Sequence, residues 1–92
     1  MIVGFRHRGL KRLFEKDDAS GIRPDMLDKV RTILTQLDEA RTIEDMRMTS
    51  FHLHSLKGNL KGFWSVTVRA NWRIVFRFAK GDADAVDLVD YH

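Results

Sequence analysis

The sequence contains no cysteine and only one proline among its 92 residues. Without cysteine the chain has no disulfide framework and no thiolate metal site. This composition is consistent with a reducing compartment, and we expect a cytoplasmic protein. No apolar run approaches the roughly 20 residues that a transmembrane helix requires. Residues 1–14, MIVGFRHRGLKRLF, mix basic and apolar side chains and lack the pattern of a secretion signal.

Acidic residues are absent from the stretch that runs from residue 47 to residue 80. The same stretch contains seven lysines and arginines, which are Arg47, Lys57, Lys61, Arg69, Arg73, Arg77 and Lys80. The formal net charge of the chain is only +3, so the placement of the charge is more informative than its size. A basic segment without acids is typical of a surface that binds a polyanion such as RNA.

Helical spacing of apolar residues dominates the first half of the chain. In RGLKRLFEK, residues 8–16, Leu10, Leu13 and Phe14 fall on one face of a short helix. Pro24 suits the first turn of a second helix over residues 24–40. The apolar stripe of that helix consists of Leu27, Val30, Ile33, Leu34 and Leu37. A third, short helix is expected to begin at Thr42, because Thr42 and Asp45 have the spacing of a capping box.

Alternation of apolar and polar residues replaces the helical spacing after residue 48. FHLH, residues 51–54, predicts a short strand. FWSVTVRANWRIVFRF, residues 63–78, predicts a β-hairpin that turns at RAN. KGD, residues 80–82, predicts another turn, and AVDLVDYH, residues 85–92, predicts a last strand.

These patterns together predict a single α+β domain over residues 1–92, in which N-terminal helices pack on a twisted antiparallel sheet. One face of the sheet would carry Trp64 and Trp72 into the core. The opposite face would be exposed and would carry Ser65, Thr67, Arg69, Arg73, Val75 and Arg77. At least three guanidinium groups would therefore lie on this exposed face or on its rim.

Proton-transfer groups and cations recur through the second half of the chain. They are His54, Lys57, Arg69, Arg73, Asp90, Tyr91 and His92. Metal-free cleavage of an RNA phosphodiester needs a base for the 2′-hydroxyl, an acid for the 5′-oxygen and fixed positive charge for the phosphorane. Histidine suits the proton steps, and the arginine fork matches two phosphate oxygens. If the last strand pairs within the sheet, these groups could meet at one end of its exposed face.

Each of these residues also has an ordinary structural interpretation. His54 could be a solvent-facing strand residue, the arginines could be solvated, and Lys57 could belong to a turn. Asp90 could pair with an arginine, and Tyr91 could fill the core. Residue types and spacing alone do not decide between these interpretations.

Several motifs nevertheless combine in a family pattern. FRHRGLKRLFEK, LHSLKGN, GFWSVTVRANWRIVFRF, KGD and the final DYH together resemble the HigB toxins of the RelE superfamily, over nearly the whole chain. The resemblance implies a small RelE-like fold of the microbial-ribonuclease type. It also implies a type II toxin that cuts messenger RNA in the ribosomal A site without a metal or other cofactor and so inhibits translation. The implied partners are the 70S ribosome, messenger RNA and a HigA-like helix-turn-helix antitoxin. Contact with DNA would occur only through the complex with that antitoxin.

The resemblance also implies a role for individual residues. His54 and His92 match active-site histidines, and Lys57 and Arg73 match groups that support the scissile phosphate. Asp90 and Tyr91 match the acid and the aromatic residue that complete the catalytic set. Arg69, Arg77 and Lys61 are expected to bind RNA. The general base would be His92 or Asp90, and a histidine would be the general acid.

Three alternatives use the same residues differently. A non-catalytic ribosome- or RNA-binding inhibitor would need the basic sheet and no proton-transfer pair. A metal hydrolase could use His54, Asp90 and His92 as ligands, although no local motif with metal-ligand spacing supports it. A purely structural, partner-binding protein would cause no growth arrest when it is expressed.

Overall fold

The computed structural model describes residues 1–90, in which helices come first and strands follow. The helical part consists of α1 (Arg8–Lys16), η1 (Pro24–Met26), α2 (Leu27–Glu39), η2 (Ile43–Met46), η3 (Thr49–Phe51) and, after the first strand, η4 (Gly58–Leu60). The strands are β1 (His54–Ser55), β2 (Phe63–Arg69), β3 (Trp72–Ala79) and β4 (Asp82–Asp90). They pair antiparallel in the order β1-β2-β3-β4. The predicted α+β fold is therefore confirmed.

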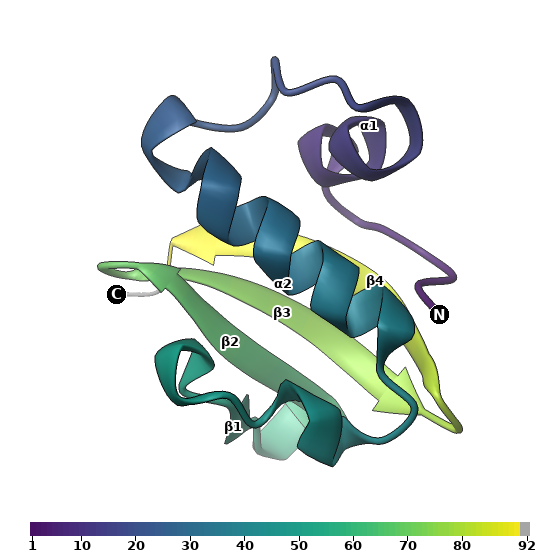
Figure 1. Cartoon of the computed structure of the whole chain (residues 1–92). Helices are drawn as coiled ribbons and strands as arrows, with labels where there is room; N and C mark the ends of the chain where they lie inside the picture. The colour runs from purple at the N-terminus through teal and green to yellow at the C-terminus, as the bar shows by residue number, and fades with distance from the viewer. Residues whose placement is uncertain (91–92) are drawn as a thin grey trace.

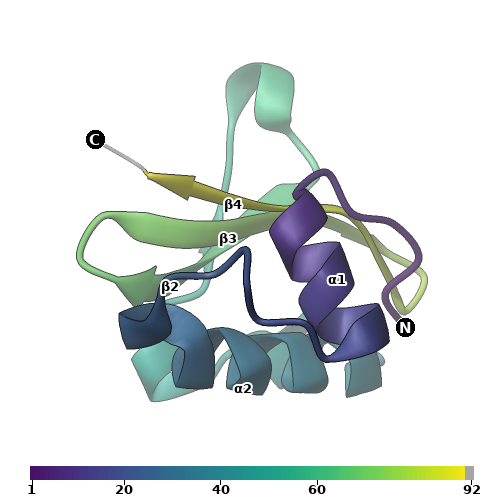
Figure 2. The same cartoon turned by 90° about the horizontal axis from the view of Figure 1, so that it is seen from above.

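The helices cover one face of the sheet. Helix α2 lies across β2, β3 and β4, and α1 packs beside it (Figure 1). On the opposite side of the sheet, Figure 2 shows the connection that contains η4 and the segment that precedes α1. We call this opposite side the open face. None of the helices formed by residues 1–90 is long and apolar enough to cross a membrane.

The apolar stripe of α2 explains why the helix binds the sheet so closely. Val30, Ile33, Leu34 and Leu37 are all buried, as their spacing predicts. From α1, Leu10 and Leu13 are buried in the same core. Phe14 differs from the expectation, because 37% of it is exposed, and its ring packs on Phe5 at a centroid distance of 5.7 Å.

The N-terminal segment adds a pairing that the sequence patterns do not reveal. Ile2 and Phe5 form parallel bridges to Ala83 and Val86 of β4. The backbone N–H of Arg6 donates to the Val86 carbonyl at 2.8 Å, and the Val86 N–H donates to the Gly4 carbonyl at 3.1 Å. The segment therefore covers part of the β4 edge and brings Arg6 to the side of the sheet.

Two elements were predicted in the connection between α2 and the sheet, of which the short helix is confirmed and the strand is wrong. The short helix after Thr42 is present, and the Asp45 carboxylate accepts the N–H groups of Arg41 and Thr42. These two hydrogen bonds lower the pKa of Asp45. The predicted strand at 51–54 is wrong, since Phe51 ends a 3₁₀ turn and His52 has a φ of +48°. Phe51 is buried without being in a strand, and the strand begins only at His54.

Substituting Gly9 with alanine is expected to destabilise the fold by about 1–3 kcal/mol. A Cβ atom at Gly9 would lie 2.7 Å from the backbone oxygen of Gly21, a group that cannot rotate away. Urea unfolding followed by circular dichroism would measure the loss. Lys11→Ala, an exposed change in the same helix, is the control and should stay within about 0.5 kcal/mol of the native value. Equal stability of the two variants would contradict this account of the close contact.

Candidate functional site

The register of the sheet determines which side chains share the open face. Directly paired residues of antiparallel strands point to the same face. Thr67 pairs with Arg73, and Ser65 pairs with Val75 on one side and with His54 of β1 on the other. The strands therefore place His54 and Arg73 on the open face, as predicted.

His54 and Arg73 also line the same hollow. A cavity of about 230 Å³ is bordered by His52, His54, Leu56, Ser65, Thr67 and Arg73. We call it the His54–Arg73 cavity. The His54 side chain is exposed, and Ser65 is buried beneath the cavity. An imidazole and a guanidinium thus border one small, solvent-accessible space.

Hydrogen bonds to the backbone orient the Arg73 side chain. Its Nη1 donates to the Ala70 carbonyl at 2.6 Å and to the Trp72 carbonyl at 3.1 Å. A guanidinium has five N–H donors, so these two bonds leave donors for an anion. The tight turn between β2 and β3 therefore holds Arg73 while its charge remains available.

Lys57 lies in a second cavity on the other side of His54. This cavity of about 390 Å³ is lined by Arg47, Leu53, His54, Ser55, Lys57 and Trp64. The Nε of Arg47 donates to Glu44 at 2.7 Å, and this bond lowers the pKa of Glu44 and raises that of Arg47. The nearby charge of Arg47 is therefore largely balanced by Glu44. Lys57 forms no ion pair of this kind with the described residues 1–90.

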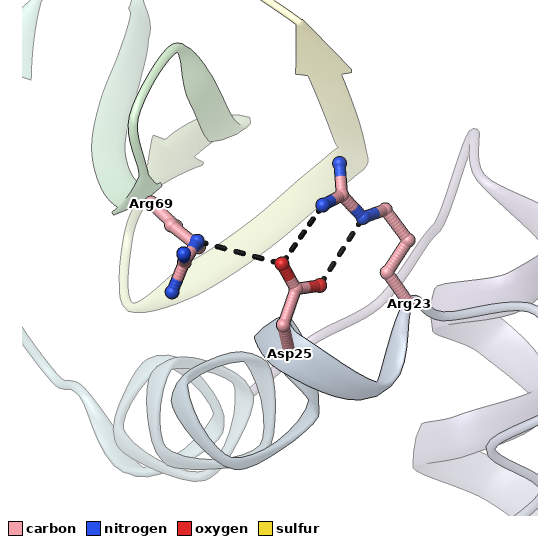
Figure 3. A network of polar contacts seen from close by, with 3 residues as sticks. All are labelled: Arg23, Asp25 and Arg69. Carbon is pink, nitrogen blue, oxygen red and sulfur yellow. Dashed lines mark hydrogen bonds and ion pairs between the residues drawn. The ribbon is translucent and has the colours of Figure 1, made fainter.

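The expected position of Arg69 on the open face is wrong. The register shifts between Thr67 and Arg69, so Arg69 pairs with Trp72, which packs against the core. Its Nε lies 3.4 Å from the Asp25 carboxylate, on the helical side of the sheet. Asp25 also accepts two hydrogen bonds from Arg23, at 3.1 and 2.8 Å (Figure 3). A single extra residue in β2 thus turns Arg69 away from Arg73.

The other predicted site residues lie at the edges of the site or outside the residues that the structure describes. Arg77 is on the open face, 5.6 Å from the Phe63 ring centroid and 3.5 Å from Asp84. Lys61 is exposed after η4. β4 ends at Asp90, which pairs with Trp72, so the expected position of its side chain on the open face is wrong: the register directs it to the helix-covered face with Trp72. Tyr91 and His92 lie outside the described residues.

Arg6 is a basic residue of the open face that was not among the predicted site residues. Its guanidinium lies 5.5 Å from the centroid of the Phe63 ring. The basic N-terminal sequence FRHRGLK was visible, but its position over the sheet depends on the long-range pairing with β4. Residues 1–90 contain no group of three histidine, aspartate or glutamate side chains that could hold a metal ion.

The open face therefore brings together groups with complementary chemistry. His54 supplies an imidazole, the type of side chain that most often serves as acid or base in catalysis. Arg73 offers a planar fork for phosphate oxygens, and Lys57, in the neighbouring cavity that Trp64 also lines, adds a point charge on the other side of His54. The arrangement suits a reaction in which a proton moves while negative charge develops on a phosphate.

Comparison with known proteins gives concordant results. A family described as "RelE-like toxin of type II toxin-antitoxin system HigB" matches residues 3–92. The chain is 46% identical to Endoribonuclease HigB of Proteus vulgaris over 92 residues, which covers all of both chains. It is 28% identical to Toxin HigB-1 of Vibrio cholerae serotype O1 over 85 residues, or 90% of each chain.

Solved structures with the same fold include other toxins. The YoeB–YefM toxin–antitoxin complex of Staphylococcus aureus contains a chain that superposes with a TM-score of 0.62 at 19% identity, covering 100% of this chain and 95% of that one. A copper-bound mutant toxin of Helicobacter pylori superposes with a TM-score of 0.56 at 17% identity, covering 97% and 91% of the two chains. At these identities the likeness concerns the fold.

Proposed function

Since this chain belongs to the HigB family of RelE-like toxins from type II toxin–antitoxin systems, we propose that it is an endoribonuclease that cleaves messenger RNA in the ribosomal A site. The observation that supports this most directly is the His54–Arg73 cavity on the open face, with Lys57 on the other side of His54. The toxin acts in the cytoplasm, where it inhibits translation. A HigA-like helix-turn-helix antitoxin keeps it silent and provides its only contact with DNA.

The proposed reaction needs no metal. A base removes the proton of the 2′-hydroxyl, the 2′-oxygen bonds to phosphorus, and the bond from phosphorus to the 5′-oxygen breaks. An acid returns a proton to the departing 5′-oxygen, so the products are a 2′,3′-cyclic phosphate and a 5′-hydroxyl. Arg73 and Lys57 stabilise the added negative charge of the phosphorane.

The proton-transfer groups come from His54 and the end of the chain. His92 is the general base in preference to Asp90, which the β3–β4 register directs to the helix-covered face, and a histidine is the general acid. Tyr91 orients the RNA or stacks on a base. Arg77 and Lys61 bind the RNA backbone outside the cleavage site.

Deleting His92 is expected to lower the cleavage rate by about 10²–10⁴-fold, the range for loss of one proton-transfer group. The assay follows cleavage of a messenger RNA held in a 70S ribosome with an empty A site. Thermal unfolding should change little, because the described core and all strands are formed by residues 1–90. Naked messenger RNA and a chelator are the controls: cleavage should require the ribosome and survive the chelator. A truncated protein with full activity would remove His92 from the mechanism, and arrest of translation without any cut would indicate a binding inhibitor.

A further inference from the structure

A second imidazole borders the His54–Arg73 cavity. His52 lines this cavity together with His54, which follows two positions later in the chain. Both side chains are exposed to solvent. Neither imidazole forms a hydrogen bond or an ion pair with the described residues 1–90. Two histidines with unused ring nitrogens therefore face one small space.

The local backbone explains why both histidines border the same cavity. His52 follows the η3 turn in a left-handed conformation, with a φ of +48° and a ψ of +55°. His54 begins β1, where its pairing with Ser65 determines the face on which it lies. Leu53, between the two histidines, packs against the core. The leucine thus anchors this stretch of chain, and the histidines on either side of it lie toward the cavity.

We propose that His52 and His54 together bind a transition-metal ion of the class that prefers imidazole, namely Zn²⁺, Cu²⁺ or Ni²⁺, and that this ion inhibits the toxin. The metal site depends only on the two side chains. Its inhibitory effect rests on the proposed function, because it assumes that His54 transfers a proton. A ring nitrogen that binds a metal uses its lone pair for that bond and is not available to accept a proton.

The type and number of donors determine which metals fit. Imidazole suits zinc, copper and nickel, whereas magnesium and calcium prefer oxygen ligands. Residues 1–90 add no third histidine, aspartate or glutamate to the pair, so the site differs from a closed structural zinc site with four protein ligands. Water would fill the other positions around the ion. The cavity of about 230 Å³ has room for them, because one water takes about 30 Å³ in the liquid.

The positive charge of Arg73 opposes the binding of a cation, since its guanidinium borders the same cavity. Its Nη1 donates to the Ala70 and Trp72 carbonyls, at 2.6 and 3.1 Å, which places part of the charge against the turn. Lys57 lies in the neighbouring cavity, on the other side of His54. Both cavities are open to solvent, so water and salt screen the repulsion. We therefore expect reversible binding that follows the metal concentration.

The first experiment follows zinc binding by NMR and does not depend on cleavage. Zn²⁺ is diamagnetic, so the imidazole signals of ¹⁵N-labelled protein can be followed during a titration. The signals of His52 and His54 should change together with one midpoint. The signal of His7, which caps α1, should stay unchanged. Mg²⁺ should change none of the three signals. Different midpoints for His52 and His54, or a response of only one of them, would overturn the proposal.

Replacing His52 with asparagine tests whether the pair is required. Asparagine removes the imidazole and tolerates the left-handed backbone at this position, so the fold should be retained. The zinc affinity should fall by at least about tenfold, because even the loss of a group that only supports a metal ligand costs about 10–100-fold. His7→Asn is the matched control, since asparagine can also cap a helix, and it should bind zinc as the wild type does. Native affinity in His52→Asn would contradict the proposed site.

Cleavage of messenger RNA on programmed ribosomes measures the inhibition. At a Zn²⁺ concentration of about ten times the Kd, the wild-type rate should fall about tenfold. A zinc-selective chelator that spares the Mg²⁺ of the ribosome should restore it. His52→Asn should cleave at the native rate without zinc and resist the same zinc concentration. If zinc slows both proteins equally, it acts elsewhere and the inference fails. If both imidazoles bind zinc but the wild type never cuts RNA, the metal site stands and the proposed function fails.

Discussion

Replacing His54 with alanine is expected to lower the cleavage rate by about 10²–10⁴-fold, because a proton-transfer group is lost. The free energy of unfolding should stay within about 0.5 kcal/mol of the native value. The side chain is exposed and belongs to a strand of only two residues, so few packing contacts depend on it. Single-turnover cleavage on programmed ribosomes measures the first quantity, and urea unfolding measures the second.

His7 offers a control with the opposite expected behaviour. Its Nδ1 accepts the Leu10 N–H at 3.1 Å, so His7 caps the N-terminus of α1, far along the chain from the site. Loss of a capping side chain costs about 0.5–2 kcal/mol. His7→Ala should therefore lose stability and retain cleavage. If both variants lost stability and activity together, the effect at His54 would be structural.

Replacing Arg73 with alanine is expected to lower the cleavage rate by about 10²–10³-fold, similar to the loss of one preorganised donor to a developing oxyanion. Arg73→Lys should recover only part of this loss, since a lysine keeps the charge but lacks the planar fork. Single-turnover kinetics at saturating ribosome concentration would separate this effect from weaker binding. The hydrogen bond to the Ala70 carbonyl is exposed at the turn, so water can replace it and the fold should survive.

Arg69 is the matched control for Arg73, because it flanks the same turn and carries the same charge. Its guanidinium is directed to Asp25 and away from the cavity. Arg69→Ala should therefore leave the chemical step within about fivefold of the native rate, since an exposed ion pair of this kind contributes at most about 1 kcal/mol, which corresponds to about fivefold. Equal losses of the chemical rate at the two positions would show that the orientation of Arg73 is unimportant.

The hairpin and the long helix were predictable because each depends on local signals. The β2–β3 turn falls at Ala70 and Asn71, within the predicted RAN, and the α2 stripe is buried as its spacing predicts. The prediction of a strand at residues 51–54 was wrong because alternation over four residues cannot distinguish a strand from a turn that buries one aromatic side chain. The Phe51 side chain is buried as the alternation requires, but it reaches the core from a 3₁₀ turn.

The candidate site was predictable in its residue types and less so in its geometry. His54 and Arg73 share a cavity because the strands pair in register from β1 to β3. Arg69 could not be placed, because alternation assumes a regular strand and the register shift reverses the face of every residue beyond it. Arg6 could not be placed either, because its position depends on a pairing with residues about 80 positions later in the sequence.

The pairing of the N-terminal segment with β4 has a consequence for biosynthesis. Residues 1–6 make their hydrogen bonds with residues 83–86, which are translated about 80 residues later. Contacts of such high sequence separation form late, because they must first overcome the entropy of closing a long loop. The position of Arg6 is therefore fixed only after residues 83–86 have been translated. A chain whose synthesis stops before residue 83 leaves the N-terminal segment unpaired and Arg6 without a fixed position beside Phe63.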